Sequence, residues 1–324
     1  MGEEVKGVHA TVSQPRFAAP LIILAGPTAS GKTSISIELA LRISGEIVNA
    51  DSMQVYRRME IGTAKPTLEE RRVVRHHMID VADPDEAFDA ASYLKGAGRI
   101  IEEVKERGKV PLVVGGTGLY IRALTRGLCQ SPPSDPEVKR KLIEVEKTKG
   151  LAELYQDLLR FDPESAARIH RNDRQRIIRA LEVFHIAGAP LSALQDRHGF
   201  REQLRPAVKV FINRERKDLY ERIDRRVDRM LEAGLKSEVE GLLAMGYSAK
   251  LKSMQSIGYR QMTAHIAGEI SMKEAVARIK RETRHYAKRQ ITWFRGDPEF
   301  WPFDAEDIEG IYDYIKIACE WADR

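Results

Sequence analysis

The segment from residue 26 to residue 33 combines glycines with a terminal lysine and threonine, a pattern that suits phosphate binding. It consists of Gly26, Pro27, Thr28, Ala29, Ser30, Gly31, Lys32 and Thr33. Glycines let several backbone N–H groups converge on phosphate oxygens, and a helix that begins at the end of the loop adds a favourable dipole. We expect Lys32 to reach an outer phosphate and the Thr33 hydroxyl to hold Mg²⁺.

Short apolar runs alternate with helical patterns in the first third of the chain. Buried strands are expected at 21–26, 46–51, 77–81 and 110–116, and a further strand of the same sheet at 207–214. Helices are expected directly after the loop and from Ala90 to Arg107, with Gly108 as the stop. This alternation is typical of a parallel sheet covered on both faces. The loop therefore lies between a strand and a helix, the context that its chemistry requires.

The strand expected at 110–116 runs into the sequence VVGGTGLY, which contains no carboxylate. Enzymes that hydrolyse nucleotides at such a loop usually hold Mg²⁺ through an aspartate that follows a strand. The acid that best fits this pattern, an aspartate after a strand, is Asp51 at the end of the second strand. The loop thus predicts phosphate binding without identifying the reaction. A diphosphate that is not part of a nucleotide is one ligand that fits, and ATP binding stays open.

The segment from 131 to 205 differs from the rest of the chain. It opens with the proline-rich break SPPSDPE, in which Asp135 and Pro136 are typical of a helix start, and it then shows helical patterns without a strand. We therefore expect an α/β fold: a P-loop NTPase-like parallel-sheet core at 19–130 and 206–324, with an inserted all-helical domain at 131–205 and a helical C-terminal region. Residues 1–18 are expected to form a flexible tail.

Composition excludes several classes of protein. The 324 residues are 43% hydrophobic with a formal net charge of +5, which fits an ordinary folded chain. Cys129 and Cys319 are the two cysteines, too few for a disulfide scaffold or a cysteine-rich metal site. No apolar run approaches the roughly 18 residues that span a membrane, and the first twenty residues lack the apolar core of a signal peptide. We expect a cytoplasmic protein that does not enter a membrane.

Several long motifs together resemble the bacterial tRNA dimethylallyltransferase family. They are GPTASGKT (26–33), NADSMQVYRRMEIGTAKP (49–66), HHMID (76–80), VVGGTGLY (113–120), NDRQRIIRALEV (172–183), SIGYRQM (256–262) and AKRQITWFR (287–295). They occur in the family's order across nearly the whole chain. The resemblance implies transfer of the dimethylallyl group of dimethylallyl diphosphate to N6 of the adenosine on the 3′ side of the tRNA anticodon. It also implies Mg²⁺ as cofactor, diphosphate in the phosphate loop, and a monomer.

The resemblance also assigns roles to residues. Lys32, Thr33, Asp51 and Arg222 are its catalytic set, with Asp51 as the base and Arg222 clamping the leaving diphosphate. From the residues alone, Asp51 suits a base or a turn cap equally. Arg222 shares a helix face with Arg226 and Arg229, but interleaved acids leave a merely solvated face as the alternative.

Contact with tRNA is expected at two basic helices. The resemblance implies contacts by Asp51, Ser52, Met53, Gln54, Thr117, Lys139, Gln175, Arg176, Ile177, Ile178 and Arg179. In the helix that starts near Asn172 or Asp173, Arg171, Gln175 and Arg179 are expected on one side. In the second helix, Arg281, Arg284, Lys288 and Arg295 are expected to form a basic stripe, with Tyr286 and Trp293 on another side. HHMID is expected to be mostly structural.

Three other functions stay open from the sequence. A P-loop kinase for a small molecule or nucleotide would need no basic RNA stripes, and the missing aspartate after the fourth strand counts against it. A prenyltransferase for free adenine nucleotides would not need the helical insertion. A non-catalytic RNA-binding protein would bind tRNA regardless of changes in the loop.

Overall fold

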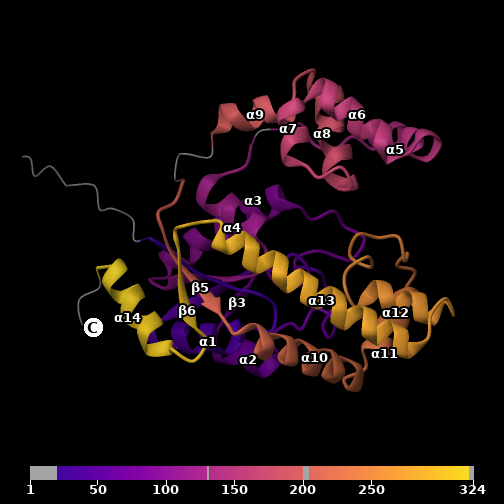
Figure 1. The fold of residues 1–324 in the computed structure, drawn as a ribbon. Coiled ribbons are helices and arrows are strands. Elements are labelled where there is room, and N and C mark those ends of the chain that lie inside the picture. The colour runs from indigo at the N-terminus through magenta and orange to yellow at the C-terminus, as the bar shows by residue number, and fades with distance from the viewer. Residues whose placement is uncertain (1–19, 130, 200–203, 321–324) are drawn as a thin grey trace, which may run out of the picture.

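The computed structural model describes residues 20–129, 131–199 and 204–320 (Figure 1). Its centre is a six-stranded sheet in the order β3-β2-β4-β1-β5-β6, with every pair of neighbours parallel. The strands are β1 (Leu21–Ala25), β2 (Gly45–Ala50), β3 (His76–His77), β4 (Val110–Gly115), β5 (Ala207–Asn213) and β6 (Phe300–Asp304). The predicted parallel α/β core is confirmed. The predicted tail at 1–18 lies outside the described residues.

Helices cover both faces of the sheet, because the central strands are apolar on both sides. One face packs against α1 (Lys32–Arg42) and α14 (Ile308–Ala318). The other packs against α3 (Ala90–Glu106), α4 (Gly118–Arg126) and the end of α13 (Met272–Arg295). Tyr93 of α3 and Tyr120 of α4 stack with ring centroids 4.1 Å apart beneath this layer. These helices hold the sheet rigidly, so the loops at its edge have fixed starting points.

Two predictions about strands were wrong. The sixth strand, β6, was not expected; it lies at the edge of the sheet, where a strand tolerates Pro302. The strand predicted at 77–81 is only two residues long, His76–His77. Met78 and Asp80 adopt positive φ angles of 60° and 58°, which ends the strand.

A helical cluster extends the core beyond the sheet. It contains α10 (Arg216–Glu232), α11 (Leu235–Ala244), α12 (Tyr259–Ile266) and most of α13, packed around the segment between β2 and α2 (Leu68–Val73). The carboxylate of Glu238 on α11 accepts hydrogen bonds from the backbone amides of Glu60, Ile61 and Gly62 and from the Tyr259 hydroxyl. This carboxylate anchors the loop that follows β2 to the C-terminal helices.

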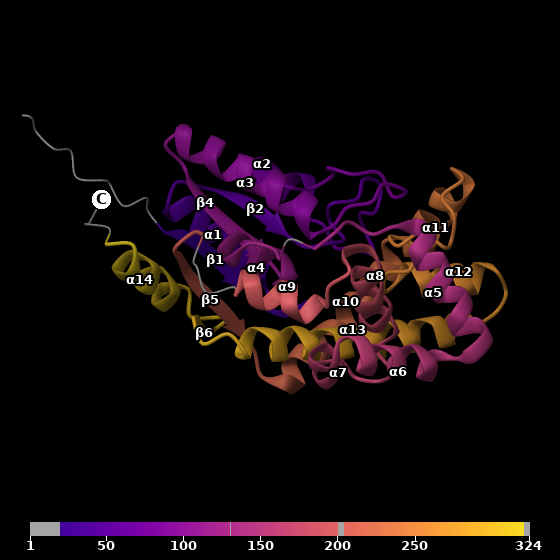
Figure 2. The ribbon, with the colours of Figure 1, turned by 90° about the horizontal axis from the view of Figure 1, so that it is seen from above.

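The remaining helices form a separate unit above the sheet (Figures 1 and 2). They are α5 (Pro136–Lys149), α6 (Leu151–Phe161), α7 (Pro163–Arg168), α8 (Arg174–Ala187) and α9 (Leu191–His198), which share an apolar core of their own. Asp135 caps α5 by accepting from the amides of Glu137 and Val138, with Pro136 at the first turn. Among the described residues, no single helix is long and apolar enough to cross a bilayer; α8 and α9 meet that requirement only as a pair bent by 79°.

Candidate active site

The carboxyl ends of the central strands bring the sequence motifs together. Because the strands are parallel, the segments that follow β1, β2, β4 and β5 all leave the same edge of the sheet. Ala25 and Ala50 both pair with Gly115, so the ends of β1, β2 and β4 are level. A Cβ at Gly115 would overlap the carbonyl oxygen of Ala50. The glycine therefore permits the close approach of the end of β4 to the end of β2, where Asp51 follows.

Hydrogen bonds from Lys32 and from two arginines stabilise the phosphate loop. Lys32 Nζ donates to the carbonyl oxygens of Gly26 (2.8 Å) and Pro27 (2.7 Å). Arg222 Nε donates to Ala29 O at 3.0 Å, and Arg214 Nε donates to Ser30 O at 3.2 Å. Positive φ angles at Ala29 (65°) and Gly31 (97°) turn the chain into α1. Burial lowers the pKa of Lys32 to about 7, although the negative charge of Asp51 opposes the shift.

A cavity of about 220 Å³ lies over this loop. The structure places all four residues of the expected catalytic set, Lys32, Thr33, Asp51 and Arg222, in its lining. Arg226 and Arg229 complete the positive side from the same face of α10, as the helical spacing predicted. Four cationic side chains around a space this size favour a compact anion with several oxygens.

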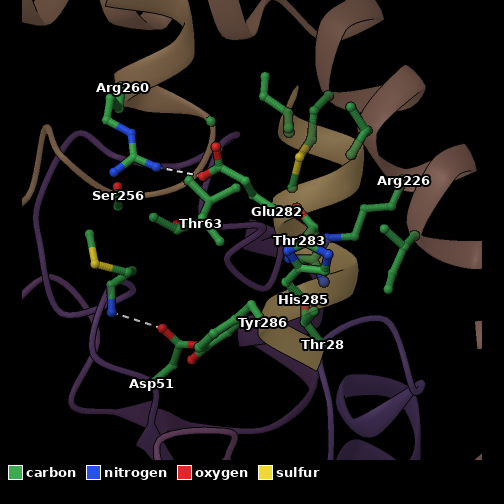
Figure 3. A pocket seen from close by; sticks show the side chains of 18 of the residues that line it. Thr28, Asp51, Thr63, Arg226, Ser256, Arg260, Glu282, Thr283, His285 and Tyr286 are labelled. Carbon is green, nitrogen blue, oxygen red and sulfur yellow. Dashed lines mark hydrogen bonds and ion pairs between the residues drawn. The ribbon is translucent and has the colours of Figure 1, made fainter. Parts of the chain in front are cut away.

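A second cavity of about 420 Å³ adjoins the first and is drawn in Figure 3. Thr28, Asp51 and Arg226 line both cavities. Ile223, Val227 and Met230 of α10, together with Ile279 of α13, give the second cavity an apolar patch. The rest of α13 lines it with polar side chains, among them Glu282 and Arg289. Arg226 was not assigned a role from the sequence, although its place four residues after Arg222 put it on the correct helix face.

Asp51 caps a turn and also lines the cavities in this arrangement. Its Oδ1 accepts from the backbone amides of Met53 (2.8 Å) and Gln54 (3.3 Å), so the cap interpretation holds for one oxygen. The carboxylate still faces the second cavity, beside Tyr286 of α13 (Figure 3). Burial raises the pKa of Tyr286, and the nearby charge of Asp51 adds to that shift, so the phenol stays protonated.

Thr117 connects two motifs that are far apart in sequence. Its Oγ1 accepts from the amide of Ser52 at 3.0 Å, and its own amide donates to Ala50 O at 3.1 Å. The Gln54 side chain turns toward the following loop, where Nε2 donates to Thr63 O (3.2 Å) and Ala64 O (3.1 Å). The predicted contact residues 51–54 and Thr117 therefore form one hydrogen-bonded unit at the cavities.

The HHMID segment contributes ion pairs that hold this unit. His77 Nε2 lies 2.6 Å from Glu46, and Asp80 pairs with Lys65 (2.5 Å) and Arg71 (2.8 Å). The Lys65 side chain is only 1% exposed. Burial alone would raise the pKa of Asp80, but the hydrogen bonds from Lys65 and Arg71 outweigh it and lower the pKa. The segment thus braces the loop after β2. Within the described ranges no cluster of three or more acidic, histidine or cysteine side chains is arranged to hold a metal.

The expected RNA contacts in the helical unit require one correction. Lys139, Gln175 and Arg176 are exposed. Ile177 and Ile178 are 0% and 3% exposed, because successive positions of α8 turn inward and both side chains join the core of the unit. Their side chains do not face outward as a contact surface would.

Arg179 of α8 is half-buried beside the segment that leads into the helical unit. It pairs with Glu182 at 2.8 Å and donates to Pro132 O at 2.5 Å. Glu182 also accepts from the Ser134 hydroxyl and the Asp135 amide. Arg179 therefore helps to fix the connection between the core and α5 in this structure.

The basic stripe expected on α13 is only partly exposed. Arg281, Lys288 and Arg295 are exposed, whereas Arg284 pairs with Asp224 of α10 and ties the two helices together. The guanidinium of Arg122 lies 4.9 Å from the ring centroid of the exposed Trp293. The exposed cations remain suitable for a phosphate backbone.

Comparison with known proteins adds independent information. A family model described as IPP transferase matches residues 54–297. The chain is 56% identical to the tRNA dimethylallyltransferase of Syntrophobacter fumaroxidans over 296 residues, which cover 91% of this chain and 86% of that protein. It is 53% identical to tRNA dimethylallyltransferase 2 of Geotalea uraniireducens over 91% of this chain and 96% of that protein.

Solved structures show the same similarity. The crystal structure of a tRNA isopentenylpyrophosphate transferase from Bacillus halodurans has a TM-score of 0.69 and 39% identity, covering 94% of this chain and 97% of the other. A eukaryotic dimethylallyltransferase, captured in crystallographic snapshots of its action on tRNA, has a TM-score of 0.73 and 30% identity, covering 90% of this chain and 75% of the other. The family model, the identity over most of the chain and the shared fold agree, and the chain belongs to the IPP transferase family.

Proposed function

We propose that this protein transfers the dimethylallyl group of dimethylallyl diphosphate to N6 of the adenosine on the 3′ side of the anticodon in tRNA. The observation that carries the proposal is the junction of two cavities at Asp51 and Arg226. One cavity is cationic and sits on a phosphate loop; the other is partly apolar and faces a carboxylate. A reaction between an allylic diphosphate and a base amine needs such a pair of adjoining sites.

The donor fits the junction by charge and polarity. Its diphosphate takes the cavity over the loop, among Lys32, Arg222 and Arg226. Its five-carbon chain extends toward the apolar side of the second cavity, near Ile223 and Val227. The three cations stabilise the negative charge that grows on the diphosphate as it departs.

The reaction exchanges one bond for another. The bond between C1 of the prenyl group and the diphosphate oxygen breaks, and the diphosphate keeps the electron pair. The lone pair of N6 forms the new bond to C1. The surplus proton of N6 passes to the Asp51 carboxylate, whose position is fixed by the amides of Met53 and Gln54. An adenine amine is a weak nucleophile, so alignment with the ionising carbon supplies much of the rate.

Magnesium fits the same cavity. The hydroxyl of Thr33 lines it and would supply a hard oxygen ligand. Mg²⁺ prefers one or two protein oxygens together with phosphate oxygens and water, which agrees with the few carboxylates present. When bound, the ion would add positive charge to the leaving diphosphate.

The acceptor is a nucleotide that is normally stacked in a loop of RNA. Its amine reaches Asp51 only if the base leaves the stack and enters the second cavity, at a cost of a few kcal/mol. Phosphate contacts by exposed cations, among them Lys139, Arg176 and Arg281, offset this cost. The anticodon stem-loop is the smallest acceptor that offers both the base and the phosphates.

One assay tests the proposal. Unmodified tRNA, an anticodon stem-loop and AMP are each incubated with the protein, Mg²⁺ and labelled dimethylallyl diphosphate, and label in the acceptor is followed. Rapid labelling of tRNA, substantial labelling of the stem-loop and negligible labelling of AMP are expected. Equal labelling of AMP and tRNA, or none of either, would falsify the proposal. Nucleotide-dependent phosphorylation in a parallel reaction with labelled ATP would favour the kinase alternative.

A further inference from the structure

The side chain of Gln290 forms hydrogen bonds to two separate segments of the active site. It lies on α13 and is 5% exposed. Its Oε1 accepts from the backbone amide of Thr28 at 2.8 Å, and its Nε2 donates to the carbonyl oxygen of Gly116 at 3.0 Å. Thr28 lies in the phosphate loop after β1, and Gly116 follows β4. One amide group therefore links α13, the phosphate loop and the end of β4.

The absence of a side chain at Gly116 leaves room for this amide. A Cβ on Gly116 would overlap Nε2 of Gln290. The second glycine of VVGG is therefore explained by the amide that occupies the position a side chain would take. Replacement of the amide would leave a partly buried N–H at Thr28 and a buried carbonyl at Gly116 without this partner, which costs free energy.

Both partners of Gln290 border the reacting groups. Thr28 lines both cavities, and Gly116 lines the cavity over the loop. The residue after Gly116 is Thr117, whose hydroxyl receives the amide of Ser52, the neighbour of Asp51. Gln290 therefore connects the loop that holds the donor with the segment that holds the base. A displacement of about 1 Å between such groups is enough to cost roughly 10²-fold in rate.

We propose that Gln290 is a positioning residue that fixes the distance between the phosphate loop and Asp51. The inference rests on the proposed function for its effect on rate, but the bridge itself is independent of the substrate. The side-chain amide of glutamine presents one acceptor and one donor, which diverge from a single carbon. A glutamate would place a second acceptor against the Gly116 carbonyl, and a methionine would fill the volume without either hydrogen bond.

The first test compares Gln290→Met and Gln290→Glu with wild type in single-turnover prenyl transfer to tRNA. We expect both variants to lose about 10- to 100-fold in rate, with the affinity for inorganic diphosphate changed by less than about 3-fold, since Lys32 and the arginines are untouched. Thr125→Val is the matched control, because it removes a buried hydrogen bond from the neighbouring α4, where the Thr125 hydroxyl donates to Ile121 O. The control should show a similar loss of melting temperature with a near-normal rate.

A second test isolates the bridge. Gly116→Ala should be strongly impaired, because the new methyl group displaces the amide. The double variant Gly116→Ala/Gln290→Ala should be no slower than Gln290→Ala alone, a non-additive result that two unrelated defects would not give. Hydrogen exchange at the Thr28 amide should be faster in Gln290→Met than in wild type or Thr125→Val, whatever the protein's substrate.

The outcomes separate the two proposals. If wild type labels no acceptor, the proposed function fails, and the exchange rates alone decide whether the bridge exists. If wild type is active and Gln290→Met matches it in rate, the positioning role is wrong. Additive losses in the double variant would also overturn it.

Discussion

The Nζ atom of Lys32 lies 2.8 Å from the carbonyl oxygen of Gly26, at the start of the loop that Lys32 ends. The lysine therefore closes its own loop through two of the three N–H donors of its ammonium group, and the third can contact a diphosphate. Burial among other cations lowers its pKa to about 7 from an ordinary value of 10.5. A bound anion would raise this pKa, so we expect diphosphate binding to be coupled to uptake of a proton.

This lowered pKa predicts a pH-dependent contribution to stability. Below about pH 7 the lysine is charged in the folded and in the unfolded protein, and the buried charge lowers the free energy of unfolding. This destabilisation decreases as the pH rises toward 10.5, because the folded protein loses the proton at a lower pH than the unfolded protein does. In Lys32→Met that dependence is absent. The melting temperature of the variant relative to wild type should therefore be highest near pH 6.5 and fall toward about pH 9.5. A constant difference across this range, measured by thermal denaturation, would contradict the assignment.

Asp51→Asn separates the two roles of this residue. The amide oxygen of asparagine still accepts from Met53 and Gln54, so the turn should be preserved, but the side chain no longer takes a proton. We expect transfer to slow by roughly 10²- to 10⁴-fold, with tRNA affinity close to wild type. Asp51→Ala should show the same loss of rate and an additional loss of stability of about 1 kcal/mol, the usual value of such a cap. Single-turnover kinetics and urea unfolding measure the two effects; a near-normal rate in Asp51→Asn rules out the base.

Tyr286→Phe tests the phenol beside that carboxylate. Because burial keeps the hydroxyl protonated, it acts as a neutral hydrogen-bonding group and adds no ionisation to the pH–rate profile. Its removal should lower the rate by about 2- to 12-fold, the equivalent of one net hydrogen bond, and leave the donor KM unchanged. The shape of the pH profile should be the same in both proteins. A new or missing limb in the variant would show that the hydroxyl itself titrates.

Arg176→Gln tests the exposed face of the helical unit. We expect weaker tRNA binding and a salt slope reduced by about 0.7 to 0.9, the contribution of one neutralised phosphate, with inorganic diphosphate binding unchanged. Arg72→Gln is a suitable control, since Arg72 is exposed on α2 at the far side of the core (Figure 1). Equal salt slopes in all three proteins, measured by filter binding, would remove Arg176 from the interface.

Ile177→Ala should behave differently from its neighbour. The side chain is fully buried in the core of the helical unit, so the truncation should cost about 2–5 kcal/mol of stability. Its effect on tRNA binding should disappear at temperatures where the unit stays folded. A loss of affinity without a loss of stability would restore Ile177 to the contact surface.

The sequence by itself determined the phosphate loop, the parallel sheet and the place of Asp51 at a strand end. These follow from short-range signals: the glycine pattern, the alternation of apolar runs with helical periods, and cap residues such as Asp135. Each of these signals depends only on residues that are close together in sequence, so it does not require knowledge of the tertiary structure. The helical spacing also put Arg222, Arg226 and Arg229 on one face, although it could not say that the face meets the loop.

Only the tertiary structure decided which side chains the loop meets and which ones face outward. Gln290 bonds to Thr28 across 262 positions, and no local pattern marks such a partner. Ile177 and Ile178 lie beside exposed residues in one motif, but helix packing turns both inward. The sequence predicts that Arg284 is a solvent-exposed cation, but in the folded protein it forms an ion pair with Asp224 of α10. In each case the deciding interaction joins elements that are distant in sequence, so its energy depends on packing that the linear pattern does not contain.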